Sequence, residues 1–267
     1  MFDWLRESWN VALLYFGQMF LAMRIPPIAS RSDEHDDVEI DSFKLIYFDV
    51  RGLGQAIRDT FKFTEIDFED KRLSFDEFSK DVKPTAPFGQ LPLLEINQDL
   101  TITQSKTILR YASKKARTYP RNHEYAAIID QWCDLHTDFM NLLTLNMYGE
   151  RYGLADAGYD KTKHRAWILE NHIPKYFGFL ETELKDGHWI GRMDTISMAD
   201  FCWNPTLCWL RDGTFDGVSA DTFSKYPNIL RFMEDVAVQL EESGAKGSRT
   251  ECEYPDDYSD TDKNKDE

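Results

Sequence analysis

The sequence predicts an α/β domain over residues 43–116, followed by an all-α domain over residues 123–242. In the first range, short apolar β-type segments flank one helical segment and then follow one another as a hairpin. In the second range, apolar residues recur at helical spacing over long stretches. At 267 residues, the chain is long enough for two domains that each bury a core.

The first three elements predict a parallel pair of strands. Phe43–Phe48 has strand character, Gln55–Phe63 has helical spacing, and Phe68–Leu73 is a second strand-like segment. A strand, a helix and a strand in this order form a parallel pair that is joined by a right-handed crossover. We therefore expect the domain to begin as a βαβ unit.

The next stretch predicts a hairpin and a helix. Leu91–Ile96 is an apolar strand with Pro92 at its start, where a proline is tolerated. A proline between a turn and a buried strand is a candidate for a cis peptide bond. Asn97–Asp99 forms the turn to a short strand, Leu100–Thr103, and a helix is expected over Ser105–Lys115.

Gln104 and Ser105 open this helix beside the strand that begins near Leu91. A helix N-terminus with a hydroxyl group and free amides suits a carboxylate or a phosphate. A strand edge beside such a site could hold a small extended peptide by its backbone and by its acidic end. A serine that caps the helix is the alternative interpretation of Ser105, and the two roles are compatible.

The second domain is expected to hold several long helices. Apolar stripes predict helices over Tyr125–Tyr148 and Thr162–Leu184, the latter kinked at Pro174. Ser197–Asp200 has the pattern of a capping box at a helix start, and we interpret it as structural. A last helix is expected over Asn228–Leu240.

The two ends of the chain are expected to lie outside these domains. Residues 1–42 combine an apolar segment, Val11–Met23, with an acidic linker; the segment is too short for a confident membrane span of about 20 residues. An interfacial helix, a signal anchor and a helix that packs on a partner remain open. We expect weak membrane association through residues 1–25, and a disordered acidic tail over residues 243–267.

Charge and composition exclude several classes of function. A net charge of −16 disfavours nucleic acid, whose phosphates would be repelled. The four cysteines form no Cys-x-x-Cys pair, and the six histidines show no ligand spacing, so neither a redox motif nor a metal site is expected. Reduced thiols in a cytoplasmic protein are the expectation.

Three motifs in order resemble those of the cytosolic glutathione transferase family, in particular its sigma-like, tyrosine-using class. They are Tyr47–Gln55, the turn from Pro87 to Pro92, and Gln104 with Ser105; the box Ser197–Asp200 follows at the family's spacing. The resemblance covers residues 43–240. It implies a thioredoxin-like glutathione-binding domain, an all-α domain and a homodimer.

The resemblance assigns catalysis to Tyr47. Glutathione must react as its thiolate, and a free thiol, with a pKa of about 8.5, is little ionised at neutral pH. A phenol O–H aimed at the sulfur would stabilise the anion. The alternative is an ordinary strand tyrosine whose ring lies in the core.

The resemblance also places glutathione along the hairpin. Gln104 and Ser105 would bind its γ-glutamyl end, the main chain of Leu91 would bond its cysteinyl backbone, and Pro92 would fix that geometry.

Three further residues are carried over as contacts with glutathione. Gln90 and Lys83 match positions that reach the glycyl carboxylate, although Lys83 could equally be a solvated surface residue. Phe78 stands where relatives often have a tryptophan that contacts glutathione, so that hydrogen bond would be lost. Leu53 stands where some sigma-class members have an arginine near the thiol.

The expected function is the conjugation of glutathione to hydrophobic electrophiles, a detoxification reaction with glutathione as co-substrate and no metal. Glutathione-dependent isomerisation of lipid endoperoxides is an alternative within the same class. A non-catalytic, crystallin-like binding or structural protein is the other alternative. The family borrows an acidic residue across the dimer, and Asp134 and Asp138 both lie in the matching helix. Phe88 matches an aromatic residue that inserts into the partner, or else it covers its own core.

Overall fold

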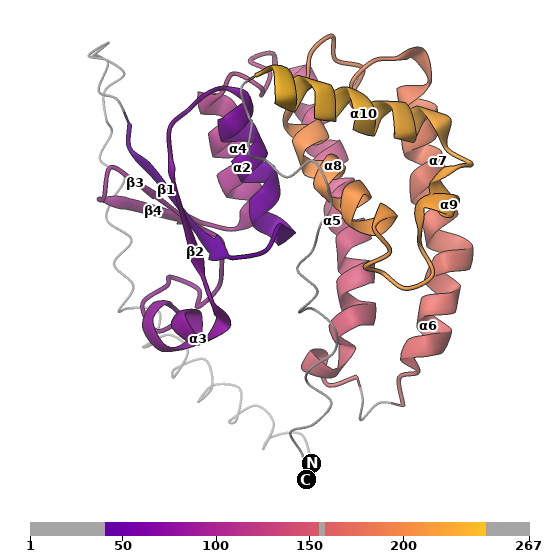
Figure 1. The fold of residues 1–267 in the computed structure, drawn as a ribbon, viewed down its shortest axis with the longest axis horizontal. Coiled ribbons are helices and arrows are strands. Elements are labelled where there is room, and N and C mark those ends of the chain that lie inside the picture. The colour runs from indigo at the N-terminus through magenta and orange to yellow at the C-terminus, as the bar shows by residue number, and fades with distance from the viewer. Residues whose placement is uncertain (1–40, 155–157, 244–267) are drawn as a thin grey trace, which may run out of the picture. The chain divides into compact units, whose positions relative to one another are not determined.

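The computed structural model describes residues 41–154 and 158–243, which lie within one compact unit, Asp41–Glu267. A small sheet with its helices lies beside a larger group of helices (Figure 1). The expectations for residues 1–40 and 244–267 fall outside the described residues. The division into domains over 43–116 and 123–242 stays a prediction.

The sheet has four strands in the order β2-β1-β3-β4. The strands are β1 (Phe43–Phe48), β2 (Glu69–Leu73), β3 (Leu93–Ile96) and β4 (Leu100–Thr103). β1 and β2 are parallel, whereas β1 pairs antiparallel with β3, and β3 with β4. The predicted βαβ unit and hairpin are therefore confirmed.

The cis peptide bond predicted at Pro92 is also present, between Leu91 and Pro92. The third strand begins at Leu93 and not at Leu91, two residues later than expected. Proline has no N–H group to donate to the ladder, so regular pairing starts only after Pro92.

One face of the sheet is covered by α2 (Gln55–Phe63) and α4 (Ser105–Lys115), which lie between the sheet and the other helices (Figure 1). Leu45 and Leu94 of the sheet and Ile57 and Phe61 of α2 are fully buried in the main core. Because α2 also contacts α8, the same core continues into the helical part.

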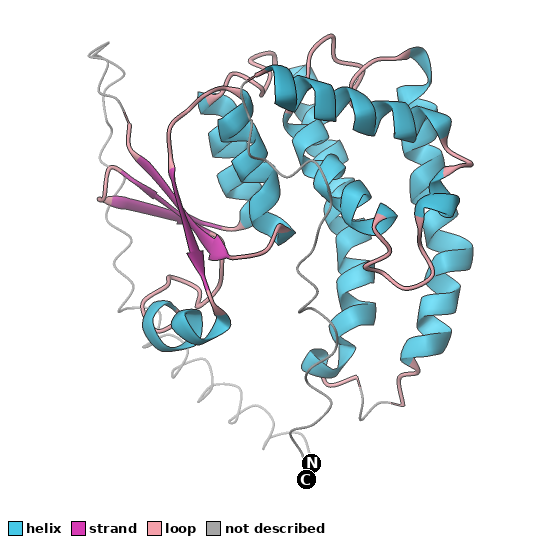
Figure 2. Ribbon diagram, viewed as in Figure 1, coloured by secondary structure: helices cyan, strands magenta, loops and turns pink. Residues whose placement is uncertain are grey.

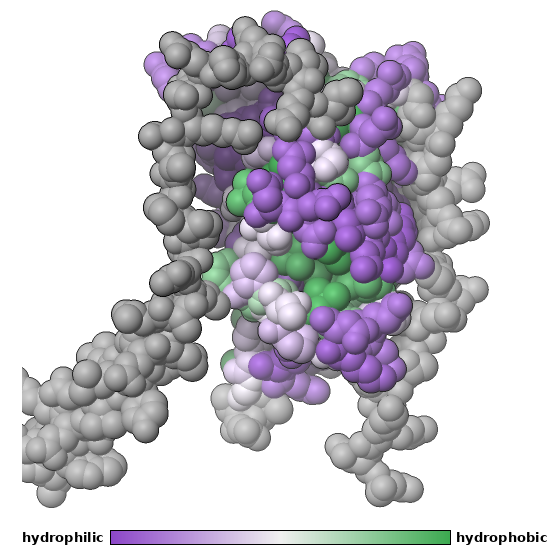
Figure 3. Space-filling view, turned by 90° about the vertical axis from the view of Figure 1, so that its left-hand side faces the viewer, coloured by the Kyte–Doolittle hydropathy of each residue, from purple (hydrophilic) through white to green (hydrophobic). Residues whose placement is uncertain are grey.

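The opposite face of the sheet carries a smaller core around Ile46, Leu73 and Leu93. A π-helical turn (Phe78–Val82), which follows a short α3 (Phe75–Glu77), supplies part of its cover. On the side of the molecule that Figure 3 turns toward the viewer, apolar side chains gather in the middle with hydrophilic residues around them.

The rest of the described chain is helical (Figure 2). Its helices are α5 (His123–Tyr148), α6 (Lys161–Trp167), α7 (Ile173–Glu183), α8 (Met198–Arg211), α9 (Ala220–Phe223) and α10 (Pro227–Glu242). The helix predicted over 162–184 is divided by a π-helical turn, Ile168–His172. This turn ends two residues before Pro174, whose ring and missing N–H disfavour regular α-helical bonding there.

The predicted capping box at α8 is confirmed. The Ser197 hydroxyl accepts a hydrogen bond from the Ala199 amide, and Asp200 Oδ2 accepts from the Ser197 amide at 2.7 Å. Asp200 is fully buried, and its Oδ1 accepts from the Ile190 amide at 2.9 Å. The box thus joins the start of α8 to the preceding loop. Within residues 41–154 and 158–243, no helix is both long and apolar enough to cross a membrane.

Candidate active site

Tyr47 lies at the end of β1, with its ring buried and its hydroxyl against the following loop. The side chain is 7% exposed, and the Leu53 amide donates a hydrogen bond to its hydroxyl oxygen at 3.0 Å. Leu53 belongs to a 3₁₀ turn, Gly52–Gly54, between β1 and α2. The ring is thus in the core, while the hydroxyl points to the loop.

Two glycines make room for this tyrosine. A Cβ atom on Gly52 would lie 2.6 Å from the Tyr47 hydroxyl oxygen, and one on Gly54 would lie 2.7 Å from its Cδ1. Gly52 also has a φ of +35°, a conformation that L side chains rarely adopt. A side chain at either position would therefore have to displace Tyr47.

A groove opens beside this loop. Its lining combines the turn before β3, the end of β4 and the start of α4: Leu53, Gln90, Leu91, Pro92, Thr103, Gln104 and Ser105. Five of the eight residues that the sequence nominated are thus brought together here. Tyr47 does not itself line the groove, but its hydroxyl accepts the hydrogen bond from Leu53, which does.

Gln104 has an unusual backbone conformation at the point where the groove meets α4. Its φ and ψ are 68° and 114°, and it is the N-cap residue of α4 without a side-chain capping bond. Ser105 is the first residue of the helix, so the alternative of a capping serine is not what the structure shows. Strained residues of this kind cluster at ligand sites, which makes the pair a candidate for contact with a ligand.

Phe78 and Lys83 are not among the residues that line the groove. The Phe78 ring packs edge-on against Phe48, with 5.3 Å between the centroids, and its side chain joins the smaller core. Lys83 is exposed and follows the π-helical turn. A contact of either residue with glutathione stays a prediction.

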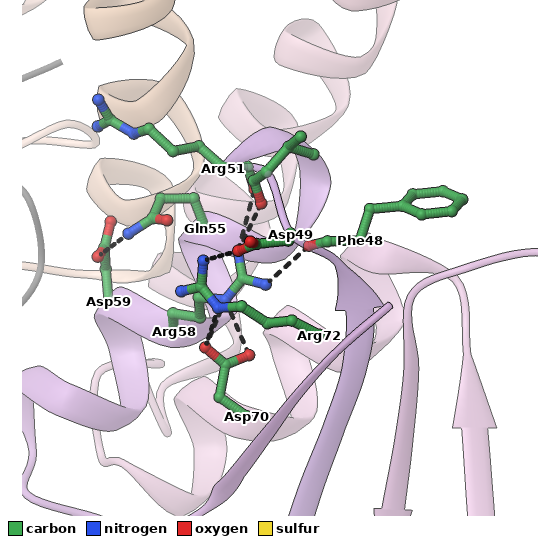
Figure 4. A network of polar contacts seen from close by, with 9 residues as sticks. Phe48, Asp49, Arg51, Gln55, Arg58, Asp59, Asp70 and Arg72 are labelled. Carbon is green, nitrogen blue, oxygen red and sulfur yellow. Dashed lines mark hydrogen bonds and ion pairs between the residues drawn. The ribbon is translucent and has the colours of Figure 1, made fainter. Parts of the chain in front are cut away.

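A network of charged residues lies behind the loop (Figure 4). Arg58 of α2 is fully buried, and its Nε donates to both carboxylate oxygens of Asp70 at 3.0 and 3.1 Å. Burial lowers the pKa of Arg58, and the Asp70 carboxylate acts in the opposite direction. Nearby, burial raises the pKa of Asp59 to about 6, while a hydrogen bond from Gln55 Nε2 at 2.8 Å opposes that shift.

A second polar cluster lies behind Ser105, where α4 meets α5 and α8. Lys106 Nζ lies 2.8 Å from His136 Nδ1 and donates to the Cys202 sulfur. His136 Nε2 lies 2.8 Å from the Thr206 hydroxyl, and burial lowers the pKa of His136. Within residues 41–154 and 158–243, no group of three or more His, Cys, Asp or Glu side chains could hold a metal ion.

With the site in view, comparisons with known proteins decide the family. A family model described as the glutathione S-transferase N-terminal domain matches residues 43–114, and one described as the C-terminal domain matches residues 151–239. Hematopoietic prostaglandin D synthase of Gallus gallus is 32% identical over 198 residues, 73% of this chain and 90% of that relative. The chain belongs to the glutathione transferase family.

Other members of the family agree. Glutathione S-transferase 2 of Caenorhabditis elegans is 34% identical over 161 residues, 59% of this chain and 82% of that relative. The crystal structure of monomeric Na-GST-3, a glutathione S-transferase from the hookworm Necator americanus, matches with a TM-score of 0.64 at 28% identity, over 80% of this chain and 99% of that chain. The glutathione transferase fold and the assignment as an enzyme of this family are therefore confirmed.

Sequence reasoning missed three residues that the structure places at or behind the site. Thr103 lines the groove, and Arg58 and Asp70 support the loop over Tyr47. One signal was available for Arg58, since it directly follows Ile57 in a helix whose apolar face is buried. A charged residue beside such a face needs a buried partner.

Proposed function

We propose that this chain binds glutathione along the groove beside Leu91 and ionises its thiol with the Tyr47 hydroxyl. The main support for this proposal is the 3.0 Å hydrogen bond from the Leu53 amide to the Tyr47 hydroxyl oxygen, because Leu53 itself lines the groove. A hydroxyl oriented in this way can donate its own proton toward a sulfur in the groove. Gln104 and Ser105 would hold the γ-glutamyl end.

The proposed reaction is transfer of the glutathionyl group, through its sulfur, to a hydrophobic electrophile. The thiol proton leaves to solvent, the thiolate attacks the electrophilic carbon, and the leaving group departs with the electron pair of the broken bond. The exposed side chain of Leu53 offers an apolar wall near the sulfur. Apolar pockets of this kind are permissive, in keeping with a broad substrate range.

Conjugation of glutathione to a chromogenic chloronitroarene tests this proposal. We expect turnover by the wild type and a loss of about two orders of magnitude in Tyr47→Phe, at the lower end of the usual contribution of a positioned proton donor. Tyr125→Phe, on an exposed tyrosine of α5, is the matched control. No turnover by the wild type would favour the crystallin-like alternative.

Isomerisation of a prostaglandin endoperoxide is a second candidate activity. Its support is the 32% identity to a relative named prostaglandin D synthase. The same tyrosine-bound thiolate would serve both reactions. Product analysis with a prostaglandin endoperoxide in the presence and absence of glutathione would separate an isomerase from a plain transferase.

Assignment to the sigma-like class, a detoxification role, a cytoplasmic location and a homodimer are also proposals. Phe88 is 59% exposed on the loop before β3, where it could insert into a second copy. Light scattering at micromolar concentration would test the dimer, and a monomer, as in the hookworm relative's crystal structure, would count against it.

Weak membrane association through residues 1–25 stays a proposal that rests on the sequence alone. Liposome flotation of the full chain and of a chain that starts at Asp41 would test it. If both remain in the soluble fraction, the proposal is wrong.

A further inference from the structure

The Arg58 guanidinium donates to the backbone that directly follows Tyr47. One terminal nitrogen donates to the Val50 carbonyl at 2.8 Å and to the Arg51 carbonyl at 3.4 Å. The other donates to the Phe48 carbonyl at 3.3 Å. A single buried side chain therefore holds three carbonyl groups of the turn between β1 and α2 (Figure 4).

Strand β2 fixes this guanidinium in turn. Arg58 Nε bonds Asp70, whose Oδ2 also accepts from Arg72 Nε at 3.0 Å. Arg72 then reaches Asp49 at 2.8 Å, so the network returns to the same turn. Charge-assisted bonds to a planar guanidinium fix geometry more tightly than bonds to a flexible ammonium.

The turn that Arg58 holds ends at the group that contacts Tyr47. Leu53 follows Arg51 by two residues, so the position of its amide depends on where the turn is held. In addition, the Arg58 Cζ atom lies 5.7 Å from the centre of the Tyr47 ring. A positive charge and an amide donor near a phenol both favour its anionic form, which makes the hydroxyl a better proton donor.

We infer that Arg58, held by Asp70, is a positioning residue that aims the Tyr47 hydroxyl at the glutathione sulfur. The inference rests on the proposed function, because it concerns the same tyrosine and the same thiol. Neither Arg58 nor Asp70 is among the residues that line the groove. Their loss should therefore alter thiol ionisation more than it alters glutathione affinity.

Two variants separate this role from simple support of the fold. Arg58→Lys keeps the charge and loses the planar fork, while Asp70→Asn keeps Arg58 and removes its charged partner. Glu69→Gln, on an exposed residue of the same strand, is the matched control. The readouts are ultraviolet titration of the bound thiol, calorimetric affinity for glutathione and the thermal midpoint.

In both test variants, we expect the pKa of the bound thiol to rise by about one unit, a tenfold loss of thiolate below that pKa. The dissociation constant for glutathione should keep its wild-type order of magnitude, and the control should match the wild type. A lower thermal midpoint with an unchanged thiol pKa would overturn the inference, because that result describes a purely structural residue.

A double-mutant cycle with Tyr47→Phe completes the test. If Arg58 acts through Tyr47, Arg58→Lys should cause no further shift of the thiol pKa in the Tyr47→Phe background. Equal shifts in both backgrounds would overturn the inference. If Arg58→Lys does not fold, Asp70→Asn takes its place in the cycle.

The same data distinguish a failure of the proposed function from a failure of the positioning role of Arg58. A wild type that does not ionise bound glutathione contradicts the proposed function itself. A wild type that does, with an effect of Tyr47→Phe but none of Arg58→Lys or Asp70→Asn, contradicts only the positioning role.

Discussion

Lys106 Nζ lies 2.8 Å from His136 Nδ1, and this contact joins the helix that begins at Ser105 to the core of the helical part. His136 is 4% exposed, so a neutral imidazole is the stable form, in keeping with its lowered pKa. The ammonium also donates to the buried Cys202 sulfur. One lysine therefore satisfies two buried groups on α5 and α8.

Lys106→Met should lower the free energy of unfolding by about 1–3 kcal/mol, since it leaves buried acceptors without their donor. Lys114→Met changes an exposed lysine on the same helix and should stay within about 0.5 kcal/mol of the wild type. Chemical denaturation of the three proteins measures both effects. Equal, small losses in the two variants would show that the contact adds nothing to stability.

Replacement of glycine by alanine should reduce activity at Gly54 but increase stability at Gly178. Gly54→Ala places a Cβ atom 2.7 Å from the Tyr47 ring, so it should displace the ring and reduce transferase activity at least tenfold, as a misplaced catalytic group does. Gly178→Ala meets nothing within 4 Å inside α7 and should stabilise the fold by about 0.5–1 kcal/mol. Steady-state rates and denaturation curves check the pair. Full activity in Gly54→Ala would show that the ring tolerates the displacement.

The raised pKa of Asp59 predicts that the stability of the fold depends on pH. Its pKa is raised by burial from 3.8 to about 6, so its contribution is fully present below about pH 4 and is lost as the pH rises through 6. The free energy of unfolding of the wild type should fall by about 3 kcal/mol between about pH 4 and pH 6 because Asp59 ionises there. Asp59→Asn should not show this fall. Denaturation at a series of pH values gives the slopes.

Asp67→Asn, an exposed carboxylate just after α2, is the control and should keep the wild-type slope. An Asp59→Asn variant with the wild-type slope would mean that Asp59 is ionised without penalty in the folded protein.

Much of the fold could be predicted because local sequence determines it. The bounds of β1, α2, β4 and α4 agree with those expected, since hydrophobic period and turn residues such as Asn97 and Asp99 delimit them. The short α3 was missed because three residues show no helical period, although Ser74 and Glu77 form a capping box around it. The π-helical turn before Pro174 was missed because proline predicts a disturbance but not its form.

The site was predictable where it is continuous in sequence. Gln90, Leu91 and Pro92 form one run, Gln104 and Ser105 form another, and the hairpin brings the two runs together. Arg58 and Asp70 were missed because their pairing joins a helix to a strand, and a charged residue in isolation is typical of a solvated face. Which side chains pair between two elements becomes visible only in the tertiary structure.

The most direct test of the central claim is an ultraviolet difference spectrum of bound glutathione near neutral pH, with the wild type and Tyr47→Phe. We predict a thiolate band in the wild type, because the Tyr47 hydroxyl stabilises the anion, and a much weaker band in Tyr47→Phe. Each unit by which the thiol pKa is lowered corresponds to about 1.4 kcal/mol of stabilisation. A band of equal strength in both proteins would contradict the role of Tyr47, and the absence of a band in the wild type would contradict the proposed enzyme.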